Sequence, residues 1–272
     1  MPELPEVEAV ARTLRRIIRG RLIHSCEVVH PIAVRPATPR ALSRHVRGAR
    51  VQDVMRCGKY MVLQLAPRGR GCLVMHFRLD GQLVWFDAGS VSGHVDVVLH
   101  FDGGALGFVD RRHFGRVLWF PSPEDCRGIH ALGVEPLTTA FTPSHLHALL
   151  RSIRRPLKLF LLDQTRIAGL GNIYSSEALW RARLNPWRIS QRVSAAEARR
   201  LHKAIVGILR RALECCLDPA PNFRDRDWWF QGLERILGVY DREGKPCRRC
   251  RTKIRRIEQG GRSTYWCPGC QK

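Results

Sequence analysis

The chain has 272 residues, enough for one large domain or two ordinary ones, each with its own core. Its formal net charge is +22 at pH 7, from 46 Lys and Arg against 24 Asp and Glu. A protein this basic is expected to bind a polyanion, most plausibly nucleic acid. The alternative is a basic surface that is only solvated and binds no partner. No apolar run approaches the ~18 residues of a membrane-spanning helix, and no signal-peptide pattern is seen, so we expect no membrane partner and a cytoplasmic location.

The first predicted element is a helix from Glu3 to Ile18, where apolar residues recur at helical spacing before Gly20. Pro2 and Glu3 stand at its start. An ordinary helix start explains both, since proline suits the first turn and acids favour the positive end of a helix. Once Met1 is removed, however, Pro2 becomes an amine with a pKa near ~8 that can attack a carbon and form a Schiff base. These residues alone leave both interpretations open.

Residues 22–120 are β-rich, with short apolar runs separated by glycine turns such as Asp102-Gly103-Gly104. This pattern predicts an antiparallel sandwich or barrel. The clearest predicted strands are 60–65, 72–75, 95–99 and 116–120.

A linker-like stretch, 121–142, begins at Pro121-Ser122-Pro123, and helical patterns dominate after it. We expect helices at 143–154, 157–164, 172–183 and 194–216, while 222–238 is less clear. The predicted fold class is therefore α+β. Its expected parts are an N-terminal β-sandwich domain (1–120), the linker (121–142), a helical domain (143–239) and a small metal finger (240–272).

Four of the ten cysteines are clustered at the C-terminus as two CxxC pairs, and the other six follow no disulfide framework. Paired CxxC sequences at this separation supply four thiolates for tetrahedral zinc. No further ligand is apparent, so we expect one structural Zn²⁺. The expected ligands are Cys247, Cys250, Cys267 and Cys270.

The segment Leu162–Tyr174 is predicted to form a helix, a turn containing Gly169 and Gly171, and a second helix. Such a turn lets backbone N–H groups and the Asn172 amide approach a phosphate. A simple helical hairpin is the plainer interpretation, and the glycines alone would favour it.

Several motifs together resemble one family. They are Met1–Glu8, Cys57-Gly58-Lys59-Tyr60, Leu132–Leu137, the Leu162–Tyr174 turn with Ser175–Leu179, and the terminal finger. In this order they resemble the formamidopyrimidine-DNA glycosylases (the MutM type), relatives of the endonuclease VIII-like enzymes, over nearly the whole chain. The resemblance implies a β-sandwich joined to a helix-two-turns-helix domain with a zinc finger, and damaged double-stranded DNA held in the cleft between the two domains.

The resemblance also implies a role for each matching residue. Pro2 would attack C1′ of the damaged nucleoside, with Glu3 as acid and base and Glu6 in support. Lys59 would contact a phosphate and assist base release, and Arg262 would take part in the final elimination. The expected phosphate contacts are Asn172 and Arg262, with Arg154 and Lys158 in addition. A monomer without an organic cofactor is expected.

Flipping a base leaves a hole in the duplex that side chains fill, and in the family two loops supply them. His76–Gly81 resembles the first loop, with Leu79 where methionine is usual. Asp110–Gly115 resembles the second, usually Asp-Pro-Arg-Arg-Phe-Gly, so Arg112 would recognise the orphaned base and Phe114 would be the aromatic wedge. Arg111 replaces the proline and His113 the second arginine. Ser92 stands where the family has a DNA-contacting histidine, and His94 follows two residues later.

A larger departure from the family lies within 215–230. The guanine-lesion enzymes usually carry a loop rich in Gly, Ser and Thr there, which covers the extruded base. This chain has Asp218-Pro219-Ala220-Pro221 and two tryptophans, Trp228 and Trp229, instead. The tryptophans would stack on a base or, as we favour, belong to the core.

The sequence therefore predicts a bifunctional glycosylase and abasic-site lyase that excises oxidised purines and cleaves the strand by β,δ-elimination. Three alternatives stay open. They are excision of oxidised pyrimidines as in the endonuclease VIII-like enzymes, lesion binding without turnover, and a zinc-ribbon transcription or RNA-binding protein.

Overall fold

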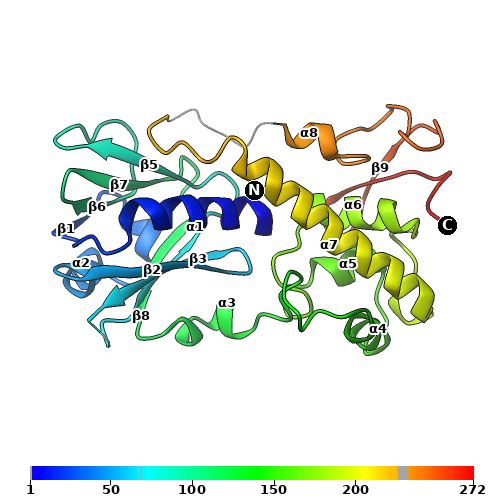
Figure 1. Ribbon diagram of the computed structural model, residues 1–272, viewed down its shortest axis with the longest axis horizontal. Coiled ribbons are helices and arrows are strands. Elements are labelled where there is room, and N and C mark those ends of the chain that lie inside the picture. Colours follow the sequence, from blue (N-terminus) through cyan, green and yellow to red (C-terminus); the bar gives the residue numbers. More distant parts are fainter. Residues whose placement is uncertain (1, 68, 226–231) are drawn as a thin grey trace. The chain divides into compact units, whose positions relative to one another are not determined.

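The computed structural model describes residues 2–67, 69–225 and 232–272, and it forms an α+β fold of two compact units (Figure 1). The first unit comprises the described residues of Met1–His130 and Cys216–Phe230, and the second those of Ala131–Cys215 and Gln231–Lys272. The segment after the long helix thus groups with the first unit. The predicted boundaries at residues 120, 142 and 239 remain a prediction. Within the described ranges, no helix has both the length and the apolar character needed to cross a lipid bilayer.

The first unit contains two four-stranded antiparallel sheets, so the sandwich is confirmed and the barrel is not. One sheet has the order β2-β3-β4-β8 and the other β1-β6-β7-β5. The strands are β1 Ser25–Val28, β2 Arg50–Cys57, β3 Tyr60–Ala66, β4 Cys72–His76, β5 Gln82–Asp87, β6 Val97–Phe101, β7 Gly104–Val109 and β8 Arg116–Phe120.

Helix α1 (Leu4–Ile18) packs along β2 and β3, as Figure 1 shows. Its inward face is apolar at helical spacing, and Leu4, Val7, Leu14 and Ile18 are all fully buried. Because this face is locked into the core, the first turn of α1 and the residues before it have a fixed place beside the sheet.

Two details of the first unit differ from the sequence-based expectation. The strand expected at 95–99 is β6 at Val97–Phe101, because the Asp96 carbonyl accepts two N–H groups, those of Val29 and His30 (2.9 and 3.1 Å), in place of regular strand pairing. Helix α2 (Pro39–Val46) was not predicted, although Thr38 caps it. Short helices follow in the linker-like stretch, a 3₁₀ turn η2 (Pro123–Asp125) and α3 (Arg127–His130).

The second unit is helical, as predicted. Helix α7 begins after Ser194, whose hydroxyl accepts the Glu197 N–H while the Glu197 carboxylate accepts the Ser194 N–H, a capping box. The helix expected to reach residue 154 ends earlier, because Ser152 closes its last turn through the carbonyls of Ala148 and Leu149. The elements are α4 Pro143–Arg151, α5 Leu157–Leu162, α6 Asn172–Ala182, α7 Ala195–Leu217, α8 Leu233–Ile236 and the hairpin β9 Arg255–Glu258 with β10 Ser263–Trp266.

Candidate functional site

The start of α1 buries two carboxylates beside Pro2. Pro2 is buried, Glu3 is 1 % exposed and Glu6 is 3 % exposed. The Glu6 carboxylate accepts the Glu3 N–H at 2.8 Å in a capping box, which fixes the backbone between Pro2 and Leu4. The structure therefore brings together three of the predicted site residues and holds them on a rigid helix end.

Lys59 lies in the two-residue turn between β2 and β3, where Gly58 has the positive φ of 58° that this kind of hairpin turn needs. Arg56 donates to the Gly58 carbonyl (2.9 Å) and to Glu8 of α1 (2.8 Å). Burial opposes ionisation of Glu8, but hydrogen bonds from Arg12 and Arg56 outweigh it and lower the pKa of the carboxyl. The turn that carries Lys59 is thus tied to α1, although sequence motifs gave no sign of this link.

His76, at the end of β4, is a second residue without a predicted role. It pairs with Tyr60 across the sheet, and its Nδ1 accepts the Arg78 N–H at 3.0 Å. Burial, with the positive charges of Arg78 and Lys59, lowers its pKa to about 3. The imidazole is therefore neutral at physiological pH, inside a basic neighbourhood.

The two predicted wedge loops lie next to each other. Leu79 is 37 % exposed and Phe114 is 48 % exposed, so both apolar side chains are open to solvent. Arg112 stacks over the Phe114 ring at 5.1 Å and reaches Asp80 of the first loop at 3.5 Å. The buried Asp110 carboxylate holds the second loop by accepting the N–H groups of Arg112 and Gly115 (3.0 and 2.6 Å).

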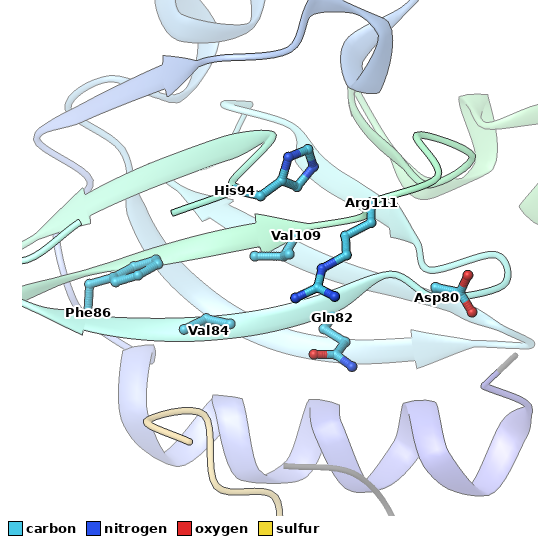
Figure 2. A pocket seen from close by; sticks show the side chains of 7 residues that line it. All are labelled: Asp80, Gln82, Val84, Phe86, His94, Val109 and Arg111. Carbon is cyan, nitrogen blue, oxygen red and sulfur yellow. The ribbon is translucent and has the colours of Figure 1, made fainter. Parts of the chain in front are cut away.

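A pocket of about 580 Å³ adjoins both loops, over β5 and the end of β7 (Figure 2). Asp80 of the first loop and Arg111 of the second border it, and Val84 and Phe86 form its apolar floor. Figure 2 also shows His94 at its rim, on the segment before β6.

The segment that departs from the family covers the edge of β5. The Phe223 carbonyl accepts the Trp85 N–H at 2.7 Å, and Arg224 forms an ion pair with Asp87 at 2.6 Å. Phe223 is 4 % exposed, so this part of the segment is packed rather than loose. Trp228 and Trp229, predicted to stack on a base or to belong to the core, lie outside the described residues.

In the second unit, the turn before α6 is held from within by Gln164. Its amide donates to the Leu170 carbonyl at 2.6 Å, and its oxygen accepts the Gly169 N–H at 3.0 Å. Asn172 then begins α6, and its side-chain amide donates to the Ser263 carbonyl at 2.8 Å. Asn172 is thus bonded to the residue that directly follows Arg262.

The predicted phosphate contacts of this unit differ in exposure. Arg262 is exposed at the tip of the β9–β10 hairpin, and Arg154 is exposed between α4 and α5. Lys158 is fully buried, and its ammonium donates to the Asn172 carbonyl (2.8 Å) and to the Ser176 hydroxyl (2.5 Å). In this arrangement Lys158 fixes the first turn of α6.

The four predicted zinc ligands come together in the finger. Cys250 and Cys267 have their sulfurs 3.4 Å apart, and those of Cys247 and Cys270 are 3.8 Å apart. Zn–S bonds of ~2.3 Å in a tetrahedron place sulfurs about 3.8 Å from one another, so the set fits one structural Zn²⁺.

Helix α6 anchors the finger. The buried Glu177 carboxylate accepts the N–H groups of Gly238, Val239 and Tyr240 at 2.8 to 2.9 Å. Trp180 of the same helix packs in the core of the finger, with Arg249 over its ring at 4.6 Å. The helix that begins at Asn172 therefore also fixes the hairpin that carries Arg262.

Comparison with known proteins decides the family. The N-terminal domain of formamidopyrimidine-DNA glycosylase matches residues 1–117, its H2TH domain matches 132–218, and the zinc finger found in this glycosylase and in isoleucyl-tRNA synthetase (FPG and IleRS) matches 244–272. The chain belongs to the formamidopyrimidine-DNA glycosylase family. It is 40% identical over its whole length to the enzyme of Pelotomaculum thermopropionicum (99% of that protein) and 39% identical to that of Synechocystis (98%).

Solved structures give the same assignment. A Lactococcus lactis family member, a mutant in complex with DNA containing Fapy-dG, superposes with a TM-score of 0.90 at 30% identity, covering all of both chains. The wild-type Lactococcus lactis protein with DNA containing an oxidised pyrimidine gives 0.89, with the same identity and coverage. This protein is accordingly a DNA repair glycosylase whose partner is DNA and whose finger takes one zinc ion.

Proposed function

We propose that this glycosylase excises oxidised purines, 8-oxoguanine and formamidopyrimidines, through a Schiff base on Pro2, and then cleaves the strand by β,δ-elimination. The observation that best supports this is the buried Pro2–Glu3 pair at the start of α1, with the Glu6 carboxylate fixing the Glu3 backbone at 2.8 Å. A secondary amine held beside an acid is the arrangement that amine catalysis needs.

The proposed chemistry begins on the sugar. The Pro2 nitrogen forms a bond to C1′ as the bond from C1′ to the base breaks, and the electron pair leaves with the base, which takes up a proton. Opening of the sugar ring at O4′ then leaves an iminium between Pro2 and C1′. Glu3 is the acid and base for these proton transfers, and Glu6 positions it.

Strand cleavage follows from the positive charge of the iminium, which acidifies the C2′ proton. Loss of that proton expels the phosphate oxygen at C3′. The double bond formed between C2′ and C3′ extends the conjugation of the iminium, so loss of the C4′ proton then expels the phosphate oxygen at C5′. Water finally releases Pro2 from the sugar fragment. Arg262 assists the last elimination in this proposal, and its exposed position at the hairpin tip leaves it accessible to DNA.

Other residues are proposed to bind the DNA phosphates and to fill the space that the flipped base leaves in the duplex. Lys59, Asn172 and Arg262 bind phosphates beside the flipped nucleotide, and Arg154 adds a contact from the α4–α5 loop. Lys158 stays a proposed phosphate contact, and its hydrogen bond to the Asn172 carbonyl also supports Asn172. Leu79 and Phe114 fill the space that the base leaves, and Arg112 recognises the orphaned base. Their exposure and the Asp80–Arg112 contact between the loops support these roles.

Excision of oxidised pyrimidines is the second candidate function. The similar Lactococcus lactis protein was crystallised with DNA containing an oxidised pyrimidine. In the present chain, Phe223 and Arg224 pack on the edge of β5, where a looser lid is usual in the guanine-lesion enzymes. A different lid changes the base that is accepted without changing the chemistry at Pro2.

Borohydride trapping tests the proposal. The mature, untagged protein and Pro2→Gly are incubated with duplexes that contain 8-oxoguanine, thymine glycol or an abasic site. We expect a covalent adduct that needs Pro2 and a higher yield on 8-oxoguanine than on thymine glycol. An equal adduct from protein whose N-terminus is blocked by an uncleaved tag would exclude the nucleophile, since Pro2→Gly still carries an α-amine, and preference for thymine glycol would favour the second candidate.

A further inference from the structure

Three histidines surround a buried carboxylate in the first unit, away from the zinc finger. Asp96 is fully buried just before β6. Nδ1 of His113 lies 2.8 Å from Oδ1 of Asp96, and Nε2 of His94 lies 3.8 Å from the same oxygen. The His30 ring completes the group, 5.0 Å from the ring of His94 and 4.9 Å from that of His113.

The backbone fixes the segments that carry these side chains. The backbone carbonyl of Asp96 accepts the N–H groups of Val29 and His30. Oδ2 of the Asp96 side chain accepts the Asp110 N–H at 2.7 Å. His113 has a left-handed φ of 53°, which its N–H stabilises by donating to the Asp110 carbonyl at 3.0 Å. Three segments far apart in sequence are thus held with their imidazoles turned toward one carboxylate.

The geometry points to a second metal site, for a divalent transition ion such as Zn²⁺, with His30, Asp96 and His113 as ligands and His94 as the fourth. One ligand atom from each of the first three lies within 4.8 Å of the others. Imidazole nitrogens and a carboxylate oxygen suit zinc, and bonds of ~2.0 Å place such atoms about 3.3 Å apart. Metal binding would draw the ligand atoms together by up to about 1.5 Å.

The site has an approach from solvent and a carboxylate that stays in place. His94 lines the pocket over β5, and its side chain is 33% exposed (Figure 2). Asp96 is oriented by the Asp110 N–H, the kind of supporting bond that raises metal affinity. A purely structural hydrogen-bond cluster, in which the 2.8 Å bond between His113 and Asp96 suffices, is the competing explanation and predicts no metal uptake.

A metal here would act on the second wedge loop, since His113 lies between Arg112 and Phe114. Bound metal would link this loop to His30 and to the segment before β6. The loop would then lose less conformational entropy when DNA binds. We expect metal-loaded protein to bind a lesion duplex several-fold more tightly. This effect on DNA rests on the proposed function of Arg112 and Phe114, whereas the metal site itself does not.

Metal titration tests the site. Protein with its finger zinc in place is titrated with Zn²⁺ and separately with Co²⁺, and uptake is followed by metal analysis and visible absorption. We expect the protein to bind a second equivalent of metal. The absorption spectrum of the added Co²⁺ should be that of an ion bound by nitrogen and oxygen atoms, without sulfur charge-transfer bands. His30→Gln and His113→Arg should each weaken this uptake at least ~10-fold. Arginine is usual in the family at the position of His113, so that variant is expected to fold.

His24→Gln is the matched control, because His24 also contacts a single carboxylate, that of Asp102 at 2.6 Å, but on an exposed surface. It should keep the second equivalent. The proposal is overturned if the wild type binds no metal beyond the one zinc ion of the finger, or if His30→Gln and His113→Arg both retain the second equivalent. Borohydride trapping on an abasic duplex, run on the same samples, reports on Pro2 chemistry independently of either result.

Discussion

Glu3 is proposed as the acid and base of the reaction, and its substitution should separate DNA binding from catalysis. It is 1 % exposed, and its backbone is held by Glu6. Replacing it by glutamine keeps the shape but removes the carboxyl group that can give and take a proton. We therefore expect Glu3→Gln to slow base excision by ~10²- to 10⁴-fold in single-turnover assays, while duplex affinity stays within about twofold.

Glu27→Gln is the matched control for this prediction, because Glu27 is an exposed glutamate of the same unit, 3.8 Å from His100. It should keep the wild-type excision rate. If Glu3→Gln also excises at that rate, Glu3 is not the acid and base of the reaction.

His76 predicts a pH dependence of stability. Its pKa is lowered to about 3 in the folded protein, whereas an unfolded chain has a histidine pKa near ~6.5. Between these values only the unfolded state binds the proton, so acidification below about pH 6.5 destabilises the fold. His76→Gln removes this group, and glutamine can still accept the Arg78 N–H.

Calorimetry at pH 7 and pH 5 measures this effect as the loss of Tm. The loss should be smaller in His76→Gln than in the wild type. An unchanged loss in His76→Gln would mean that the imidazole is not held neutral in the folded protein.

At the scale of elements, the Arg56 side chain ties the turn of the β2–β3 hairpin to α1. Arg56 is nearly buried and joins Glu8 of α1 to the Gly58 carbonyl, next to Lys59. Arg56→Met leaves the carboxylate and the carbonyl without this donor and removes this link between the turn and α1. We expect a cost of about 1–3 kcal/mol in the free energy of unfolding and a lower excision rate.

Arg12→Met provides the comparison, because Arg12 contacts the same Glu8 carboxylate at 2.7 Å from a half-exposed position. Exposed pairs contribute ~0–1 kcal/mol, so this variant should resemble the wild type in urea unfolding and in activity. If the two variants have equal stability and equal activity, Arg56 does not position Lys59.

Elements with a local signal were predicted well, and those decided by tertiary contacts were not. Helix α1 and the long α7 show helical periodicity over many residues, and Ser194 and Glu197 form a recognisable capping pair. Helix α2 is only eight residues long, so its buried Leu42 and Val46 give too short a pattern. The start of β6 depends on what the Asp96 carbonyl binds, which no local pattern contains.

The same distinction holds for the candidate site. Cys247 and Cys250 are three residues apart and predict a metal ligand pair by spacing alone, and the structure brings all four cysteines together. The group around Asp96 unites residues from position 30 to position 113, and no spacing rule connects them. Buried positioning contacts, such as that of Arg56 with Glu8, are likewise a product of the fold.

At the scale of the whole molecule, the net charge of +22 predicts strongly salt-dependent DNA binding. Each phosphate neutralised releases counterions, so the logarithm of the affinity should fall linearly with the logarithm of salt concentration. The slope counts the phosphate contacts. Arg262→Ala should reduce its magnitude by about one, because it removes one exposed cation from the hairpin tip.

The zinc finger and the Pro2 site belong to different compact units, which predicts that they can be damaged separately. Cys267 is fully buried in the finger core, so Cys267→Ser removes a zinc ligand and loosens the hairpin that carries Arg262. We expect less bound zinc by metal analysis and weaker DNA binding. At limiting DNA the borohydride adduct on an abasic duplex should fall, whereas at saturating DNA it should return to the wild-type yield.

The ratio of the two strand-cleavage products should also change in Cys267→Ser. Since Arg262 is proposed to assist the last elimination, Cys267→Ser should accumulate the β-elimination product at the expense of the δ-elimination product, even with saturating DNA. Cys26→Ser, at a buried thiol of the first unit, is the control and should leave zinc content and product ratio unchanged. Unchanged zinc content in Cys267→Ser would refute the assigned ligand set, and loss of the adduct at saturating DNA would show that Pro2 chemistry depends on the finger.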